Sequence, residues 1–260
     1  MPAKLPSTGL GNERSEWFRG HFDAAQEVLD LCASSGVPVT GKRLADIGCG
    51  DGIIDLGLVI KGSPAELVGY DLNPVDTDKL LAEAKAEEGI TELPGELTFV
   101  QSQPERIPAE DESFDLVVTW SAFEHVADPE ALLREIRRVL SADGALFLQL
   151  WPFYNSEHGT HLWEWFPDGF AQFTHSDAEI TERIESDQAS DPGWGAMMLS
   201  EYRALNRITL DDLGVAIERA GLRVVRLKLI TNDCFIPASA AGTPLSTLAI
   251  GGVQLLAVPA

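Results

Sequence analysis

The stretch Arg43–Gly52, RLADIGCGDG, decides the fold class of this chain. A short apolar segment runs into a turn in which Gly48, Gly50 and Gly52 alternate with other residues. Glycine lets the backbone turn sharply and approach a ligand closely, and a helix that begins there presents free backbone N–H groups. The stretch therefore predicts a strand, a glycine loop and a helix that together bind a nucleoside cofactor.

An acidic residue at the end of the next predicted strand narrows the choice of cofactor. Asp71 follows Gly50 by 21 residues, and a carboxylate at that place can accept hydrogen bonds from both ribose hydroxyls. A dinucleotide loop would have its third glycine where this chain has Ile53. Asp46 would repel a pyrophosphate but suits a cationic ligand. These residues favour S-adenosylmethionine, which carries a sulfonium and an ammonium group, over NAD.

Strand and helix patterns alternate along most of the chain. Strands are expected at residues 43–47, 66–70, 97–100, 114–119, 145–150, 222–230 and 253–258, and helices at 13–35, 52–61, 73–88, 128–140 and 209–220. The order predicts one α/β domain over residues 1–260, a three-layer sandwich with a mostly parallel seven-stranded sheet. The last strand is expected to be antiparallel because no crossover helix is visible before it. Residues 152–206 lack a clear period and form an insertion after the fifth strand.

The composition excludes several classes of partner. With 19 basic and 41 acidic residues the formal net charge is −22, which opposes binding to nucleic acid and to anionic membranes. No apolar run is long enough for a membrane span, and the N-terminus lacks the apolar core of a signal peptide. The three cysteines show no paired spacing, so we expect a reducing, cytoplasmic setting.

Three motifs in order resemble those of class I S-adenosylmethionine-dependent methyltransferases that act on small molecules. They are LADIGCGDG, VGYDLNP and the block from Ser113 to Leu150 that begins SFDLVVTWSAFEHVADP. The resemblance covers roughly residues 40–150. It implies cofactor contacts at Asp46, Gly48, Cys49, Gly50, Asp71, Leu72, Gln103, Trp120 and Ser121. Gln103 departs from the family, which often has an aspartate there, and the Cys49 side chain is expected to be packed rather than reactive.

Histidines are the predicted catalytic residues. Transfer to a hydroxyl needs a base, and imidazole titrates near neutrality. His125 follows the fourth strand, while His158 and His161 lie in the insertion among tryptophans and acidic residues. The insertion is therefore expected to be a lid over the acceptor, with its aromatic residues serving either as a stacking surface or as its own core. An HxxH pair can also bind a metal, but no metal site is predicted because a third and a fourth ligand are not evident.

The sequence thus predicts transfer of a methyl group from S-adenosylmethionine to a small molecule, most readily to a hydroxyl oxygen. Two alternatives stay open. One is a protein that binds S-adenosylmethionine without transferring the methyl group, and the other is an NAD-linked oxidoreductase. The identity of the acceptor and the oligomeric state are not readable from the sequence.

Overall fold

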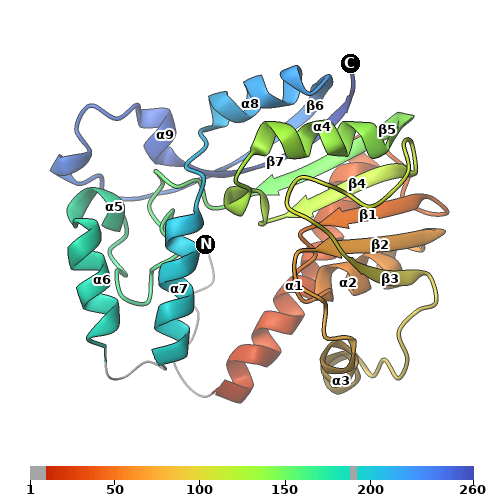
Figure 1. The fold of residues 1–260 in the computed structure, drawn as a ribbon, viewed down its shortest axis with the longest axis horizontal. Coiled ribbons are helices and arrows are strands. Elements are labelled where there is room, and N and C mark those ends of the chain that lie inside the picture. The colour runs from red at the N-terminus through yellow and green to blue at the C-terminus, as the bar shows by residue number, and fades with distance from the viewer. Residues whose placement is uncertain (1–9, 188–191) are drawn as a thin grey trace. The chain divides into compact units, whose positions relative to one another are not determined.

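A seven-stranded sheet organises the chain, here in a computed structural model that describes residues 10–187 and 192–260 (Figure 1). The strands hydrogen bond in the order β3-β2-β1-β4-β5-β7-β6. Their bounds are β1 Arg43–Ile47, β2 Glu66–Asp71, β3 Leu97–Gln101, β4 Phe114–Trp120, β5 Leu140–Leu150, β6 Leu222–Thr231 and β7 Ile250–Pro259. Strand β1 pairs in parallel with β2 and β4, and β6 pairs antiparallel with β7. The predicted mostly parallel α/β sheet with an antiparallel last strand is confirmed.

Helices connect most of these strands. Their bounds are α1 Leu10–Ser34, α2 Ile53–Gly62, α3 Thr77–Glu88, α4 Pro129–Val139, α5 Ala171–Thr174, α6 Asp177–Glu185, α7 Pro192–Ala204, α8 Leu210–Arg219 and α9 Leu245–Ala249. Two short 3-10 turns, η1 Phe123–His125 and η2 Ala238–Ala240, complete the elements. Among the residues that the structure describes, no helix combines the length and the apolar content needed to cross a membrane.

The chain divides into two compact units. In the described part of the chain the first contains residues 10–119 and 138–147, and the second contains residues 120–137, 148–187 and 192–260. The first unit therefore holds the glycine loop and the first three helices, and the second holds the predicted insertion and the C-terminal strands. The prediction of one domain with a lid at residues 152–206 remains a prediction.

Helix α1 packs closely on helix α2 in the first unit. One side of α1 buries Phe18, Phe22, Ala25 and Val28, as the helical spacing of the apolar residues predicts. A glycine makes the contact with α2 possible, because a Cβ atom at Gly57 would lie 2.7 Å from the Phe22 carbonyl oxygen and 2.8 Å from the Ala25 Cβ. The two backbones thus approach more closely than any larger residue allows.

Replacing Gly57 by valine should lower the free energy of unfolding by about 1–3 kcal/mol, because the side chain forces α1 and α2 apart. Gly20, in exposed helix surface of α1, provides the matched control, since a Cβ there meets nothing within 4 Å. Gly20→Ala should leave the stability unchanged or raise it by up to about 1 kcal/mol through helix propensity. Urea denaturation followed by circular dichroism measures both. Equal stabilities of the two variants would contradict the close packing.

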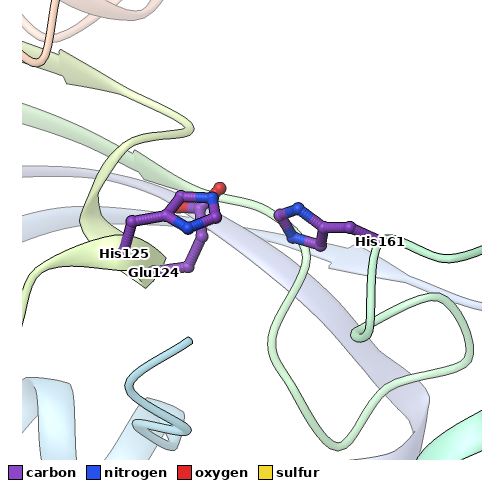
Figure 2. A group of neighbouring side chains, drawn as sticks. All are labelled: Glu124, His125 and His161. Atoms are coloured by element: carbon purple, nitrogen blue, oxygen red, sulfur yellow. The ribbon is translucent and has the colours of Figure 1, made fainter. Parts of the chain in front are cut away.

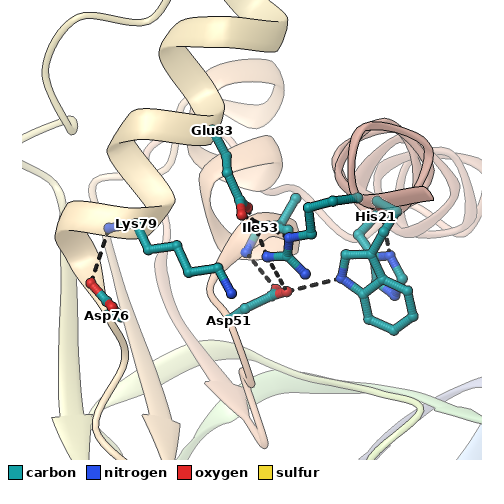
Figure 3. Close-up of polar contacts among 8 residues, drawn as sticks. His21, Asp51, Ile53, Asp76, Lys79 and Glu83 are labelled. Atoms are coloured by element: carbon teal, nitrogen blue, oxygen red, sulfur yellow. Dashed lines mark hydrogen bonds and ion pairs between the residues drawn. The ribbon is translucent and has the colours of Figure 1, made fainter. Parts of the chain in front are cut away.

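Three predicted details are wrong. Helix α3 begins at Thr77 after the N-cap Asp76, whose side chain accepts a hydrogen bond from Lys79 N at 3.0 Å (Figure 3), and not at Asn73. The Asn73 backbone N–H donates instead to Asp71. Strand β5 begins earlier than predicted, so that Gly144 lies inside it. The segment before β7, expected to lack helices, contains η2 and α9, which are too short to show a sequence period.

The insertion forms a helical core within the second unit. Helices α5, α6 and α7 surround apolar side chains that include Trp165, Phe166, Ile180 and Tyr202. Helix α6 begins at a capping box in which Ser176 and Glu179 bond to each other's backbone N–H groups. Trp165 and Phe166 thus stabilise the insertion itself, which is one of the two roles that their composition allowed.

Candidate functional site

The glycine loop after β1 adopts the predicted sharp turn. Gly48, Gly50 and Gly52 have φ angles of 79°, 57° and 76°, in the left-handed region that favours glycine. The backbone N–H groups of Gly48 and Cys49 both donate to the Tyr70 carbonyl oxygen, at 2.8 and 3.1 Å. The start of the loop is therefore tied to the end of strand β2. The Cys49 side chain is buried, which raises the pKa of its thiol, so it is a packed group as expected.

Asp71 lies at the end of the neighbouring parallel strand β2 and hydrogen bonds to the glycine loop. Its Oδ2 accepts a hydrogen bond from Gly50 N at 3.0 Å, and its Oδ1 accepts one from Asn73 N at 2.9 Å. Each carboxylate oxygen retains a further lone pair for a ligand hydroxyl. The adjacent Leu72 is 49% exposed, and its carbonyl accepts a hydrogen bond from the Gln101 side chain. The structure thus brings the predicted loop and the predicted ribose-binding acid together.

Two glycines of the loop differ in what surrounds them. A Cβ atom at Gly50 would meet nothing within 4 Å, whereas a Cβ atom at Gly52 would lie 2.5 Å from the ring of Phe99. Gly52 is therefore required for packing, and Gly50 faces open space. Open backbone beside Asp71 is the geometry that a closely approaching ligand needs.

A pair of buried acids lies beneath the loop. Asp46 on β1 is 2% exposed and Asp55 in the first turn of α2 is fully buried. Asp46 Oδ1 and both carboxylate oxygens of Asp55 have no hydrogen-bond partner outside the pair, and the two side chains hydrogen bond to each other. Burial raises the pKa of Asp46 to about 7, with a further contribution from the charge of Asp71. Burial also raises the pKa of Asp55 well above its usual value, and the charge of Asp46 adds to that rise.

Asp55 was not among the predicted site residues, although a signal for it exists. It is the only acidic residue in the apolar helix IIDLGLVIKG. A lone carboxylate in such a helix, one turn after a glycine loop, indicates a buried polar group that has a role in the site. A nearby cation would favour the charged forms of these two acids, so the pair suits a cationic ligand group.

The loop is also held from the N-terminal helix, which the sequence did not predict. Figure 3 shows Asp51 within a network that reaches α1 and α3. Arg14 donates to Asp51 at 3.2 Å and makes two 2.7 Å hydrogen bonds with the Glu83 carboxylate. Trp17 Nε1 donates to Asp51 at 2.9 Å, and its ring stacks on His21. Trp17 is accordingly 47% exposed rather than part of the apolar side of α1.

The other predicted cofactor residues occupy different surroundings. Gln103, in the first unit, is exposed and forms an isolated backbone bridge with Arg106. Trp120 and Ser121 belong to the second unit, at the end of β4. The Ser121 N–H donates to the Gln149 carbonyl oxygen at 3.1 Å, and the Gln149 side chain donates to Ser121 Oγ at 3.0 Å. Ser121 is thereby fixed to β5.

Two of the three predicted catalytic histidines come together in the second unit. His125 and His161 have ring centroids 5.2 Å apart, at an angle of 82°. Glu124 joins them, and the three side chains each offer a ligand atom within 4.8 Å of the others (Figure 2). His158 does not belong to this group, because its imidazole lies beside Trp163 and 3.8 Å from the Glu157 carboxylate. We call Glu124, His125 and His161 the Glu-His-His cluster.

Burial controls the charge of the Glu-His-His cluster. It lowers the pKa of His161 to about 3 and lowers that of His125, although the nearby Glu201 carboxylate opposes the second shift. It also raises the pKa of Glu124 to about 8. Both imidazoles are therefore neutral at pH 7 and keep a free lone pair for a proton or a metal ion. Sequence reasoning missed Glu124, whose position directly before His125 was its only signal.

Comparison with known proteins agrees with the predicted family. Residues 45–148 match the family model described as a methyltransferase domain. Over 125 residues the chain is 35% identical to a ubiquinone biosynthesis O-methyltransferase of Cereibacter sphaeroides, which covers 47% of this chain and 46% of that protein. The chain therefore spans about half the length of the curated relative that it matches.

Solved structures share the fold at low sequence identity. A SAM-dependent methyltransferase of Thermotoga maritima has a TM-score of 0.51 at 17% identity, with 96% of each chain covered. The [4+2]-cyclase SpnF has a TM-score of 0.55 at 17% identity, covering 90% of this chain and 80% of that one. The fold, the three motifs and the matched family model agree that residues 45–148 form a methyltransferase domain.

Proposed function

We propose that the protein transfers a methyl group from S-adenosylmethionine to a hydroxyl oxygen of a small molecule. The observation that carries the donor half is the hydrogen bond between Gly50 N and Asp71 Oδ2, because it joins the glycine loop to the ribose-binding acid. The open space at Gly50 and the buried carboxylate of Asp46 fit the same cofactor. When bound, S-adenosylmethionine supplies an activated methyl group.

In this proposal the residues of the first unit bind and orient the donor. Asp71 accepts the two ribose hydroxyls, and Leu72 packs against the adenine. The loop backbone at Gly48 and Gly50 lies along the methionine part, and Asp46 provides negative potential for its cationic groups. These contacts fix the position of the methyl group, and positioning supplies much of the rate of a displacement reaction whose donor is already activated.

The part of the proposal that concerns the methyl acceptor rests on residues of the second unit. A hydroxyl must lose a proton to become a good nucleophile, and the neutral imidazoles of the Glu-His-His cluster suit that chemistry. The name of the Cereibacter relative, an O-methyltransferase, supports a hydroxyl acceptor. The matched family model ends at residue 148, before the insertion that is proposed to select the acceptor. We therefore assign the acceptor class as hydroxylated small molecules and no more narrowly.

A transfer assay tests this proposal. The protein is incubated with methyl-labelled S-adenosylmethionine and a panel of phenols, catechols, amines and carbon acids. We expect label on a hydroxyl oxygen, with one S-adenosylhomocysteine released for each methyl group transferred. Calorimetric titration should detect S-adenosylmethionine and not NAD.

Two outcomes of that assay would favour the alternatives. Tight binding of S-adenosylmethionine without turnover of any acceptor would support a protein that binds the cofactor for another purpose. The shared fold of the cyclase SpnF gives this alternative a specific basis, because that protein is named for a different reaction. Binding of NAD in place of S-adenosylmethionine would overturn the cofactor assignment itself.

A further inference from the structure

The Glu-His-His cluster has the composition of a metal site. Glu124 and His125 lie in the 3-10 turn η1, and His161 lies in the insertion, 36 residues further along the chain. Their ligand atoms lie within 4.8 Å of one another, and Figure 2 shows the His161 imidazole facing His125 and Glu124. Zn²⁺ lies about 2.0–2.2 Å from its nitrogen and oxygen ligands, so the three side chains would move closer together to share one ion.

Two of the three side chains carry a buried polar atom without a hydrogen-bond partner. Glu124 is only 4% exposed, and its Oε2 accepts no hydrogen bond. His161 Nε2 is buried without a hydrogen bond as well, whereas His125 Nδ1 has the Glu201 carboxylate 3.2 Å away. Leaving a buried polar group unsatisfied costs about 1–3 kcal/mol, and two such groups in one cluster are not expected from packing alone. A bound cation satisfies both at once.

The backbone holds these ligands in place. The Asn206 side chain donates to the carbonyl oxygens of Phe123 and Val126, at 2.8 and 2.9 Å, and so brackets the turn that carries Glu124 and His125. The Asn206 N–H donates in addition to the Glu124 carbonyl oxygen at 2.9 Å. His161 has a φ angle of 63°, a left-handed conformation that is unfavourable for a residue with a side chain. Such strain is common where a side chain must be aimed at a functional site.

The donor set selects the class of metal ion. Two imidazoles and one carboxylate suit Zn²⁺ and similar transition-metal ions, whereas Mg²⁺ and Ca²⁺ prefer oxygen ligands. Three protein ligands leave at least one position for water or for a ligand hydroxyl, as in catalytic zinc sites. Glu201 Oε2, 3.2 Å from His125 Nδ1, adds a second carboxylate beside the cluster. Trp163, with its ring centroid 6.1 Å from that of His161, adds an apolar wall.

We propose that Glu124, His125 and His161 bind one divalent transition-metal ion of the Zn²⁺ type. The sequence did not predict this site, because the HxxH pair lacked further ligands. The structure supplies them by pairing His161 with Glu124 and His125 and by leaving His158 outside. Where the inference touches catalysis it rests on the proposed function: a coordinated hydroxyl becomes more acidic, and the two histidines then act as ligands rather than as bases.

Titration with Zn²⁺ tests the metal site directly. The full chain is freed of metal with a chelator and titrated by calorimetry with ZnSO₄, and in parallel with MgCl₂. We expect one Zn²⁺ per chain, much weaker binding of Mg²⁺, and visible d–d absorption of a low-coordinate site when Co²⁺ replaces Zn²⁺. The variants Glu124→Gln and His161→Ala should each weaken Zn²⁺ binding at least about tenfold to 100-fold.

His158→Ala is the matched control, because it removes a neighbouring histidine that lies outside the cluster, and it should leave Zn²⁺ binding unchanged. If Glu124→Gln fails to fold, His161→Ala still decides the question, since thermal unfolding reports on folding separately. Absence of stoichiometric Zn²⁺ binding, or equal weakening by His158→Ala, overturns the proposal. Calorimetric titration with S-adenosylmethionine on the same samples separates failure of the metal site from failure of the proposed function.

Discussion

Replacing Asp71 by alanine should weaken S-adenosylmethionine binding by about two orders of magnitude. Hydrogen bonds to a charged group contribute about 1.5–3 kcal/mol each, and two ribose hydroxyls are proposed to donate to this carboxylate. The substitution also removes the acceptor for the Gly50 and Asn73 N–H groups, which loosens the glycine loop. Isothermal titration calorimetry at constant pH and ionic strength measures the change in the dissociation constant.

A graded series separates these two effects. Asp71→Asn keeps the shape and one acceptor oxygen, so we expect it to lose only about tenfold in affinity. Asp78→Ala, which removes an exposed acid from the first turn of α3, is the charge-matched control and should bind like the native protein. Native affinity in Asp71→Ala would show that the cofactor does not use this acid, and the proposed donor site would then be wrong.

The donor side was predictable because its determinants are local. The loop residues have positive φ angles, which the glycines in the sequence predict. Asp71 is placed by the register of the neighbouring parallel strands β1 and β2. Strand β1 therefore begins and ends where the pattern predicts. Asp55 could also have been found, since an acid inside an apolar helix stands out. The hydrogen bond from Arg14 to Asp51 could not be predicted from the sequence, because it depends on how α1 packs against the rest of the first unit.

The Glu-His-His cluster was not predictable because its determinants are distant in sequence. His161 reaches Glu124 and His125 only through the path of the insertion, and Asn206 holds their turn from 80 residues away. The left-handed φ angle of His161 cannot be predicted from the sequence, because histidine does not favour that conformation. The HxxH spacing suggested that His158 and His161 act as a pair. In the structure His161 instead lies beside Glu124 and His125, in the turn after β4.

Asp46→Asn should have two opposite effects, lower affinity for S-adenosylmethionine and higher stability of the protein without ligand. The carboxylate provides the negative potential proposed to attract the cationic end of the cofactor, so its loss should cost about tenfold to 100-fold in affinity. The same carboxylate is 2% exposed, so its charge opposes folding. A residue that is kept despite this cost is expected to serve the ligand.

The pH dependence gives the stability effect a definite sign. In the unfolded chain Asp46 loses its proton near pH 4, whereas in the folded chain its pKa is raised to about 7 by burial. The folded state binds more protons between these values, so the free energy of unfolding falls as the pH rises from about 4 to about 7. Above pH 7 the full penalty of the buried charge is present. Asparagine removes this contribution.

Thermal unfolding at pH 5 and at pH 8 therefore tests the role of Asp46. We expect Asp46→Asn to unfold at a higher temperature than the native protein at pH 8, and the difference between the two temperatures should be smaller at pH 5. Asp55→Asn is the comparison: it also removes a buried acid, but one that is not proposed to face the cofactor, so stability should rise with a smaller loss of affinity. Saturating S-adenosylmethionine should stabilise the native protein more than Asp46→Asn at pH 8. A variant that loses stability at pH 8 and keeps native affinity would place the function of this acid in folding and not in binding.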